Sequence, residues 1–199
     1  MSRLYIYGAS GHGLVVKDIA QLCGYDEIIY IDDGVNEYPS FDSLEKDLSI
    51  PIVFGIGDTR IREKLFRKVE KSGFSLINLI HPSAIIAKDV IIQKGTVVMA
   101  NVVINTGSTI GEGVILNSSS IIEHENYIGN FVHISPNVAL AGNVTIGLNT
   151  HIGIGSSIIQ SISIGKNSII GAGSVVVKDI TNNVIAYGNP CKVIRKLDE

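Results

Sequence analysis

A histidine between two glutamates, Glu123-His124-Glu125, is the segment best suited to chemistry. A carboxylate beside an imidazole orients the ring and makes it a better proton acceptor, which suits a general base. The alternative is a solvated turn of ordinary polar residues. Asn126, directly after, interrupts a pattern of small residues, and such departures are expected where function dictates the residue more than folding does.

A second candidate site is the glycine-rich loop Gly8-Ala9-Ser10-Gly11-His12-Gly13, between a strand expected at 4–7 and a helix expected at 14–23. Backbone N–H groups at the start of a helix can hold an anion such as a diphosphate. Asp32 and Asp33 end the next expected strand, at 28–31, and could bind ribose hydroxyls or a base edge. The spacing is GxxGxG and not GxGxxG, which favours a single nucleotide, such as a sugar nucleotide, over NAD. The alternative is a tight turn with a surface acidic pair.

The second half of the chain repeats every six residues. Aliphatic side chains recur at this interval from position 80 to position 176, seventeen times without a slip. Neither an α-helix nor a flat sheet sustains that period, whereas a triangular coil with one hexapeptide per side does. The repeated positions are Ile80, Ile86, Ile92, Val98, Ile104, Ile110, Leu116, Ile122, Ile128, Ile134, Leu140, Ile146, Ile152, Ile158, Ile164, Ile170 and Val176.

A longer period of eighteen residues supports three sides per coil. Glycines recur at this interval, and His133 and His151 should lie above one another on adjacent coils. We expect the glycines to stack at corners because they tolerate the turns. The run gives between five and six coils, and Pro190 with the tail 192–199 is suited to capping the end. The stacked glycines are Gly111, Gly129, Gly147 and Gly165 at one corner, and Gly153 and Gly171 at another.

The first eighty residues follow a βαβ pattern, with further elements expected at 52–56, 59–71 and 76–80. The predicted fold is therefore an α/β, Rossmann-like domain at 1–80 followed by an all-β, left-handed parallel β-helix at 81–199. Its 16 basic residues are scattered, which argues against a nucleic-acid partner. No apolar run is long enough for membrane insertion and no signal peptide precedes the first strand, so we expect a cytoplasmic protein. Cys23 and Cys191 form no metal or disulfide motif, and neither has an adjacent base for thiol catalysis.

Several motifs together resemble the PglD/NeuD-type sugar acyltransferases of the hexapeptide-repeat superfamily. The resemblance covers nearly the whole chain and includes YIYGASGHG at 5–13, the aspartate pair at 32–33 and LNSSSIIEHE at 116–125. It also includes AGNVTIG at 141–147 and YGNPCKVI at 187–194, where Cys191 replaces the usual alanine.

The resemblance implies acetyl transfer from acetyl-CoA to the 4-amino group of a UDP-linked 4-amino-4,6-dideoxy sugar, by a homotrimer with active sites between subunits. It assigns His124 as the general base and Glu125 as the partner that raises its basicity. The remaining roles fall to two sets of residues, and no metal is implied. The nucleotide sugar would contact Ser10, Gly11, His12, Asp32, Asp33, Gly57 and Asn117, and acetyl-CoA would contact His133, Ile154 and Ala172, the last in place of a common glycine.

Direct transfer is the mechanism these residues favour: His124 takes a proton as the sugar amine attacks the thioester, and backbone N–H groups stabilise the oxyanion. Three alternatives remain. These are O-acetylation of sialic acid or another sugar, N-acetylation of a GDP-linked amino sugar, and a non-catalytic scaffold or nucleotide sensor.

Overall fold

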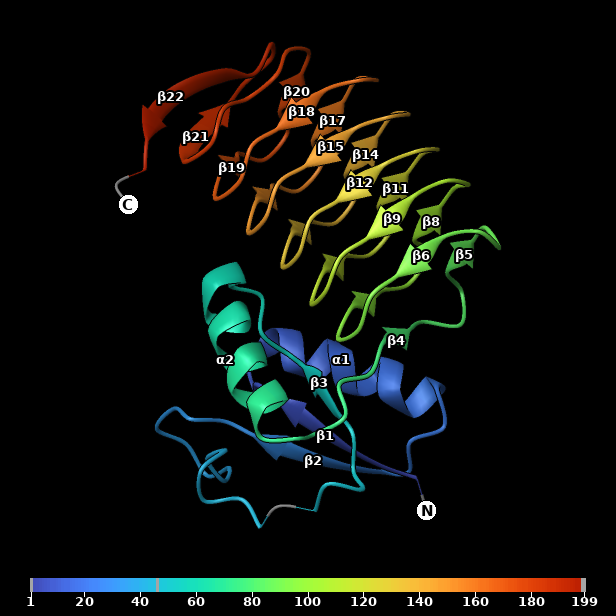
Figure 1. Cartoon of the computed structure of the whole chain (residues 1–199), viewed down its shortest axis with the longest axis vertical. Coiled ribbons are helices and arrows are strands. Elements are labelled where there is room, and N and C mark those ends of the chain that lie inside the picture. Colours follow the sequence, from blue (N-terminus) through green and yellow to red (C-terminus); the bar gives the residue numbers. More distant parts are fainter. Residues whose placement is uncertain (1, 46, 198–199) are drawn as a thin grey trace.

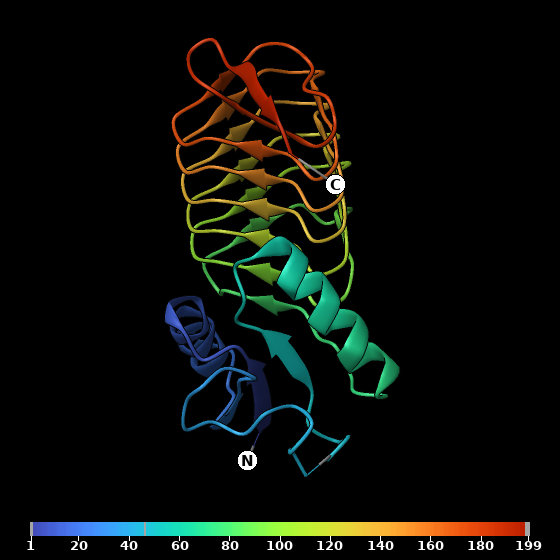
Figure 2. The same ribbon diagram turned by 90° about the vertical axis from the view of Figure 1, so that its left-hand side faces the viewer.

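The computed structural model describes residues 2–45 and 47–197, and it has two parts (Figures 1 and 2). A small α/β unit lies at one end, and a parallel β-solenoid of about six turns rises from it. The predicted class, a Rossmann-like unit followed by a parallel β-helix, is confirmed. Within the described ranges, no helix has the length and apolar content needed to cross a bilayer.

The α/β unit is built on a three-stranded parallel sheet in the order β2-β1-β3. Its strands are β1 (Arg3–Tyr7), β2 (Glu27–Ile31) and β3 (Ile52–Phe54). Helix α1 (Gly11–Leu22) connects β1 to β2, and α2 (Thr59–Lys71) follows β3. Because β1 is central and its neighbours lie on opposite sides, the chain reverses its direction of winding beside β1, which is where ligands bind in such sheets.

Helix α1 begins at Gly11, three residues before the predicted start, because the turn between strand and helix is unusually tight. Gly8 has a φ of +109°, which glycine adopts readily. A Cβ on Gly13 would collide with the carbonyl oxygen of Gly8, and one on Gly55 would lie 2.6 Å from the Cα of Gly13. Three glycines therefore let the loop, the helix and the end of β3 meet through their backbones.

The solenoid consists of two-residue strands, and the predicted aliphatic position is the second residue of each. Strands eighteen residues apart pair in parallel, as in Ile115↔His133 and Leu116↔Ile134, so the register does not slip. The aliphatic side chains fill one continuous core. The strands are β4 (Leu79–Ile80), β5 (Ile85–Ile86), β6 (Ile91–Ile92), β7 (Val97–Val98), β8 (Val103–Ile104), β9 (Thr109–Ile110), β10 (Ile115–Leu116), β11 (Ile121–Ile122), β12 (Tyr127–Ile128), β13 (His133–Ile134), β14 (Ala139–Leu140), β15 (Thr145–Ile146), β16 (His151–Ile152), β17 (Ser157–Ile158), β18 (Ser163–Ile164), β19 (Ile169–Ile170) and β20 (Val175–Val176).

The stacked glycines serve close packing, which corrects the reason predicted for them. Gly129, Gly147 and Gly153 do stack in columns, but they do not have positive φ. A Cβ on Gly147 would instead lie 2.5 Å from the backbone nitrogen of Lys166 on the next coil. The left-handed turn positions are other residues, of which ten are not glycine and have φ between 54 and 59°, and five are glycines with φ between 59 and 73°. The ten are Asn101, Ser119, Glu125, Phe131, Asn137, Asn143, Asn149, Ser161, Asn167 and Asn183, and the glycines are Gly95, Gly107, Gly113, Gly155 and Gly173.

Buried polar side chains tie successive coils together. The Ser108 hydroxyl donates to the Glu123 carbonyl and accepts from the backbone N–H of Asn126. Asn126 makes the equivalent bonds with its amide, donating to the Ala141 carbonyl at 3.0 Å and accepting from Val144 N–H at 3.0 Å. Buried polar groups need such partners. Asn126 therefore has a structural role, whereas the sequence predicted that function dictates this residue more than folding does.

The strand expected at 76–80 in the α/β sheet is the one element placed wrongly. Only an isolated bridge joins Leu76 to Ile52, while β4 (Leu79–Ile80) pairs with β7 and begins the solenoid. Leu79 also packs in a core shared with α1. Because one core spans both parts, a domain boundary at residue 80 stays a prediction.

A hairpin closes the far end of the solenoid. Strand β21 (Val184–Tyr187) continues one sheet, and β22 (Lys192–Lys196) pairs with it in antiparallel fashion. Cys191 between them is buried against the last coil. The described part of the tail therefore forms a cap, and residues 198 and 199 of the predicted cap lie outside the described residues.

Gly147→Ala should lower the free energy of unfolding by about 1 to 3 kcal/mol, because an added methyl group overpacks a backbone contact. Urea denaturation measures the change. Asn137→Gly is the matched control, since glycine accepts the same left-handed φ, and it should stay within about 0.5 kcal/mol of wild type. Equal stability of Gly147→Ala and wild type would contradict the close-packing explanation.

Candidate functional site

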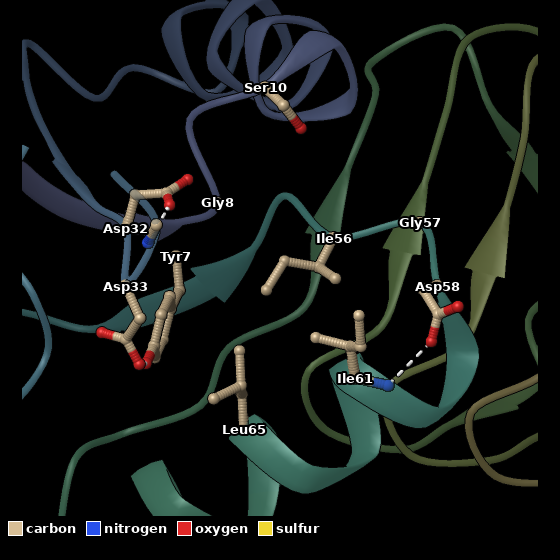
Figure 3. Close-up of a pocket in the computed structure, with 11 residues that line it drawn as sticks. Tyr7, Gly8, Ser10, Asp32, Asp33, Ile56, Gly57, Asp58, Ile61 and Leu65 are labelled. Atoms are coloured by element: carbon tan, nitrogen blue, oxygen red, sulfur yellow. Dashed lines mark hydrogen bonds between the residues drawn. The ribbon is translucent and has the colours of Figure 1, made fainter. Parts of the chain in front are cut away.

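A cavity of about 360 Å³ opens at the carboxyl ends of β1, β2 and β3. Figure 3 shows the acidic strand ends on one side and the first turns of α2 on the other, with the Ser10 hydroxyl pointing into the space between them. The cavity lies at the reversal of winding beside β1, as expected for a nucleotide site. Its lining includes Tyr7, Gly8, Ser10, Asp32, Asp33, Gly34, Ile56, Gly57, Asp58, Ile61 and Leu65.

Asp32 holds the glycine-rich loop in place. Its Oδ2 accepts a hydrogen bond from Ala9 N–H at 2.9 Å, and its Oδ1 accepts from Gly34 N–H at 2.8 Å and from Asn36 Nδ2 at 2.9 Å. The bond from Ala9, which outweighs partial burial, lowers the pKa of Asp32 below its ordinary value. The carboxylate therefore stays ionised at the rim of the cavity and acts as a fixed acceptor.

Asp33 is engaged with Tyr7, which the sequence did not single out. The Tyr7 hydroxyl donates to Asp33 Oδ2 at 2.5 Å, and Phe41 N–H donates to Oδ1 at 2.9 Å. Burial acts to raise the pKa of Asp33, but these bonds and Lys68 outweigh it, so the pKa is lowered. Burial, followed by the bond to Asp33, raises the pKa of Tyr7. The pair forms an ionised acceptor with an apolar ring beside it.

The opposite wall of the cavity is apolar. Ile61 and Leu65, one turn apart on α2, face the tyrosine together with Ile56 (Figure 3). Asp58 begins the helix and accepts a hydrogen bond from Ile61 N–H at 2.8 Å. An apolar wall that faces fixed hydrogen-bond acceptors is the usual composition of a small-molecule site.

Below the cavity, the loop at Gly57 rests on the solenoid through His133. His133 Nδ1 lies 3.1 Å from the Gly57 carbonyl, and its Nε2 lies 3.3 Å from Asn117 Nδ2. A carbonyl can only accept, so Nδ1 carries the proton and Nε2 accepts from the amide. The predicted stacking with His151 is confirmed, with ring centroids 4.6 Å apart. The structure thus joins Gly57, Asn117 and His133.

These histidines are held in the neutral form. Burial, followed by the charges of His151 and Arg62, lowers the pKa of His133 to about 3. Burial and then Arg62 lower the pKa of His12 to about 4. His12 lies on the first turn of α1 with its ring centroid 6.2 Å from that of His133, which places it between the glycine-rich loop and the solenoid. Gly11, beside it, has open space where a Cβ would be.

The turn that carries His124 lies over a glycine. Gly142 is one coil away, and a Cβ there would collide with the imidazole ring. His124 Nδ1 lies 3.0 Å from Glu125 Oε2, which leaves Nε2 as the free ring nitrogen when Nδ1 carries the proton. Glu125 has a φ of 58°, a strained value for this residue type, and Asn126 fixes the turn through the Glu123 carbonyl. The sequence held a signal for Gly142, since it follows His124 by eighteen residues.

Within one chain, His124 is remote from the nucleotide cavity. Its turn joins β11 to β12, which belong to two of the three solenoid sheets. The α/β unit packs on the third sheet, through Val97 and Ile115. A corner of a triangular coil is opposite the face formed by its third side. The structure therefore does not bring His124 and Glu125 together with the residues of the cavity.

The last predicted residues lie farther along the solenoid. Ile154 and Ala172, one coil apart, line an open apolar depression of about 380 Å³ that also includes His151. The depression lies on the sheet that carries His133, so the three residues predicted to contact acetyl-CoA share one side of the solenoid. The sequence did not identify Gly142, Tyr7, Ile61 or Leu65 as site residues. Ile61 and Leu65 nevertheless gave a signal, because they are one helical turn apart in the helix that follows Gly57.

The fold is that of a hexapeptide-repeat acyltransferase, and the comparisons with known proteins agree. The family model for the PglD N-terminal domain matches residues 3–69. The acetyltransferase domain of PglB from Neisseria gonorrhoeae is 36% identical, with a TM-score of 0.91 over 98% of this chain and 100% of that one. The same domain has been solved in complex with acetyl coenzyme A.

Two further relatives carry sugar-specific names. A variant of GDP-perosamine N-acetyltransferase from Caulobacter crescentus, in complex with CoA and GDP-perosamine, is 34% identical with a TM-score of 0.90, over 98% of each chain. UDP-N-acetylbacillosamine N-acetyltransferase of Bacillus subtilis (strain 168) is 31% identical over 112 residues, and the match spans about half of each protein, 50% of this chain and 52% of that one. The chain belongs to the PglD-type sugar N-acetyltransferases, which are acetyl-CoA-dependent enzymes.

The neutral histidines predict that stability falls in acid. An unfolded histidine has a pKa of about 6.5, so below that pH the unfolded chain binds more protons than the folded one. Stability should be fully present above pH 6.5 and be lost as the pH falls toward 4 and then 3, the pKa values of His12 and His133. Urea denaturation between pH 7.5 and pH 4.5 measures this, and His133→Gln should show a shallower loss. His81→Gln is the control, and equal slopes in all three proteins would contradict the burial argument.

Proposed function

We propose that the protein transfers an acetyl group from acetyl-CoA to the amino group of a nucleotide-linked amino sugar. The observation that carries this proposal is the cavity beside β1. It offers an apolar wall, two ionised carboxylates and the open start of α1, which together suit a base, a ribose and a diphosphate. A UDP-linked 4-amino-4,6-dideoxy sugar is the leading acceptor, as in the resemblance first noted.

In this proposal, Ser10, Gly11 and His12 contact the diphosphate and Asp32 and Asp33 contact the nucleoside. Gly57 and Asn117 complete the sugar's surroundings. Acetyl-CoA lies along His133, Ile154 and Ala172, and the apolar depression that Ile154 and Ala172 line suits an extended pantetheine arm. The similar N. gonorrhoeae acetyltransferase domain, which was solved in complex with acetyl coenzyme A, supports the choice of donor.

The chemistry is direct transfer. The amine nitrogen attacks the thioester carbonyl, His124 Nε2 takes the proton that the nitrogen loses, and the C–S bond breaks to release the CoA thiolate. The same proton can then pass from His124 to the thiolate. Glu125 holds Nδ1–H and stabilises the imidazolium that forms between the two steps. No covalent acyl-enzyme intermediate is needed.

A second copy of the chain completes this site. In one chain, His124 faces away from the cavity, so a base from a neighbouring subunit has to reach the sugar amine. The two sheets that flank His124 also carry exposed apolar side chains, which are suited to a subunit interface. We therefore propose a homotrimer with active sites between subunits. The exposed side chains are Ile85, Ile91, Ile121 and Tyr127.

A GDP-linked amino sugar is the second candidate acceptor. The similarity to the C. crescentus enzyme with bound GDP-perosamine favours it, since that match covers nearly the whole of both chains. Turnover of GDP-linked and UDP-linked amino sugars, compared in the same assay, distinguishes the two candidate acceptors.

His124→Ala should lower kcat by about 10² or more, because general base catalysis contributes that much or more to similar reactions. The assay follows release of the CoA thiol with acetyl-CoA and a panel of UDP- and GDP-linked amino sugars, with product identified by mass spectrometry. Lys178→Ala, at the end of the solenoid, is the control and should keep wild-type turnover. Wild-type protein that turns over none of the amino sugars would sink the proposed function, and unchanged kcat in His124→Ala would remove the base.

Mixing two inactive variants tests the shared active site. Asp32→Ala impairs the nucleotide side and His124→Ala impairs the base, so a mixed oligomer contains some sites with both wild-type groups. Co-expressed with different tags and purified through both, the mixture should regain between a tenth and a half of wild-type activity, roughly the share of intact sites that random mixing leaves. Light scattering of wild type should give a trimer. No recovery in a verified mixed oligomer would place both groups in one subunit.

A further inference from the structure

Arg62 on α2 is a buried cation between the α/β unit and the solenoid. Its side chain is 1% exposed. Every acceptor that the described residues offer it is a backbone carbonyl oxygen, so no carboxylate hydrogen-bonds to it, and burial outweighs the charge of Asp58, which acts to raise its pKa. The hydrogen bonds run from Nε to Gly113 at 2.7 Å, from Nη1 to Ile56 and Gly57 at 2.9 Å each and to Asp58 at 3.4 Å, and from Nη2 to Phe131 at 2.7 Å and Val132 at 3.3 Å.

A buried charge without a counter-ion is costly, and apolar residues usually stabilise such positions at least as well. Burial lowers the pKa of Arg62 to about 9, and the side chain therefore stays charged at neutral pH. Carbonyl dipoles compensate part of the cost. Stability alone therefore does not explain why an arginine occupies this position beside the cavity.

The bonds of Arg62 connect the cavity to two coils of the solenoid. Ile56 and Gly57 line the cavity, while Gly113 and Phe131 are corners of successive coils. The Gly57 carbonyl accepts from both Arg62 and His133, so the orientation of this peptide group is set by α2 and the solenoid together. Phe131 holds a φ of 57°, a strained value that its packing against Phe66 and the bond to Arg62 help to maintain.

The charge of Arg62 also complements the cavity. Asp32, Asp33 and Asp58 line it, and among the described residues its lining includes no lysine or arginine, although Lys68 Nζ lies 3.7 Å from Asp33 Oδ2. A nucleoside diphosphate adds further negative charge. Arg62 lies directly behind the Gly57 peptide, away from solvent, where low dielectric makes its field strong. Its effect on His12 and His133, whose protonation it disfavours, shows that this field reaches both sides of the loop.

We propose that Arg62 is a positioning residue for nucleotide binding: through the Gly57 carbonyl and its buried positive charge, it fixes the loop at Gly57 that lines the cavity and offsets the negative charge of the diphosphate. The inference rests on the proposed function, because it assumes a nucleoside diphosphate in the cavity. It assigns to the junction of the two parts a role in substrate affinity in addition to its role in holding them together.

Arg67 provides a matched control on the same helix. It also connects α2 to the solenoid, bonding Glu112 at 3.0 Å and stacking over Phe131 at 5.1 Å, but it does not line the cavity. Replacing Arg67 should weaken the junction without altering the Gly57 peptide. A loss common to both arginines therefore reports stability, and a loss specific to Arg62 reports nucleotide binding.

Titration calorimetry with UDP and GDP, on wild type, Arg62→Met, Arg62→Lys and Arg67→Met, tests the inference. Arg62→Met should raise the nucleotide Kd about tenfold or more, and Arg62→Lys should raise it less because the charge is kept while the forked hydrogen bonds are lost. The KM for the nucleotide sugar should rise, and the KM for acetyl-CoA should not. If Arg62→Met does not fold, Arg62→Lys alone must show the increase.

Melting temperatures and near-ultraviolet circular dichroism establish the folded fraction of each variant. Equal Kd values for the folded Arg62 and Arg67 variants would overturn the inference and leave the proposed function standing. Wild-type protein that binds neither nucleotide would overturn the proposed function and the inference with it.

Discussion

The register of eighteen residues per coil is the constraint on which the rest of the structure depends. From β4 to β20, each coil hydrogen-bonds to the one below it without a slip, so residues eighteen apart are direct neighbours; the separation falls to sixteen only where the cap begins, as in Ile169↔Ile185. That rule places Gly142 over His124, stacks His133 on His151 and lets Asn126 hold two coils at once. A single inserted residue would turn each later side chain to a different face. The turn proposed to carry the general base and the fold itself therefore depend on the same periodicity.

The junction of the two parts depends on a different kind of interaction. It combines an apolar core shared by α1 and the first coils with a buried cation, Arg62, whose hydrogen-bond acceptors among the described residues are peptide carbonyls. Histidines nearby are kept uncharged by burial and by that cation. The junction thus places the positive charge of Arg62 behind a cavity that is lined by acidic side chains. The backbone at Gly57 lies between this charge and the cavity.

Much of this was predictable from sequence because repetition makes the evidence cumulative. Seventeen aliphatic positions specify the solenoid, and the boundaries of α2 agree with the structure residue for residue. Errors arose where tertiary packing decides. The strand at 76–80 has the right composition for either sheet, and only packing assigns Leu79 to the solenoid. Arg62 reads as an ordinary charged helix residue, since its burial depends on coils far along the chain. The sequence located the glycine-rich loop and the His124 turn along the chain. It did not predict that they lie on different sides of the solenoid.

The solenoid also measures length. Adjacent coils are separated by the spacing of hydrogen-bonded strands, about 4.8 Å, whatever their side chains. His133, Ile154 and Ala172 lie on successive levels of one side, so the protein marks off distance along its axis in fixed steps. A ligand bound along that side contacts side chains whose spacing along the axis is fixed by the hydrogen bonds between coils. Gain or loss of a whole coil preserves the contacts within each coil and changes only the length of the solenoid. The length available to a ligand along the axis therefore changes only by whole coils.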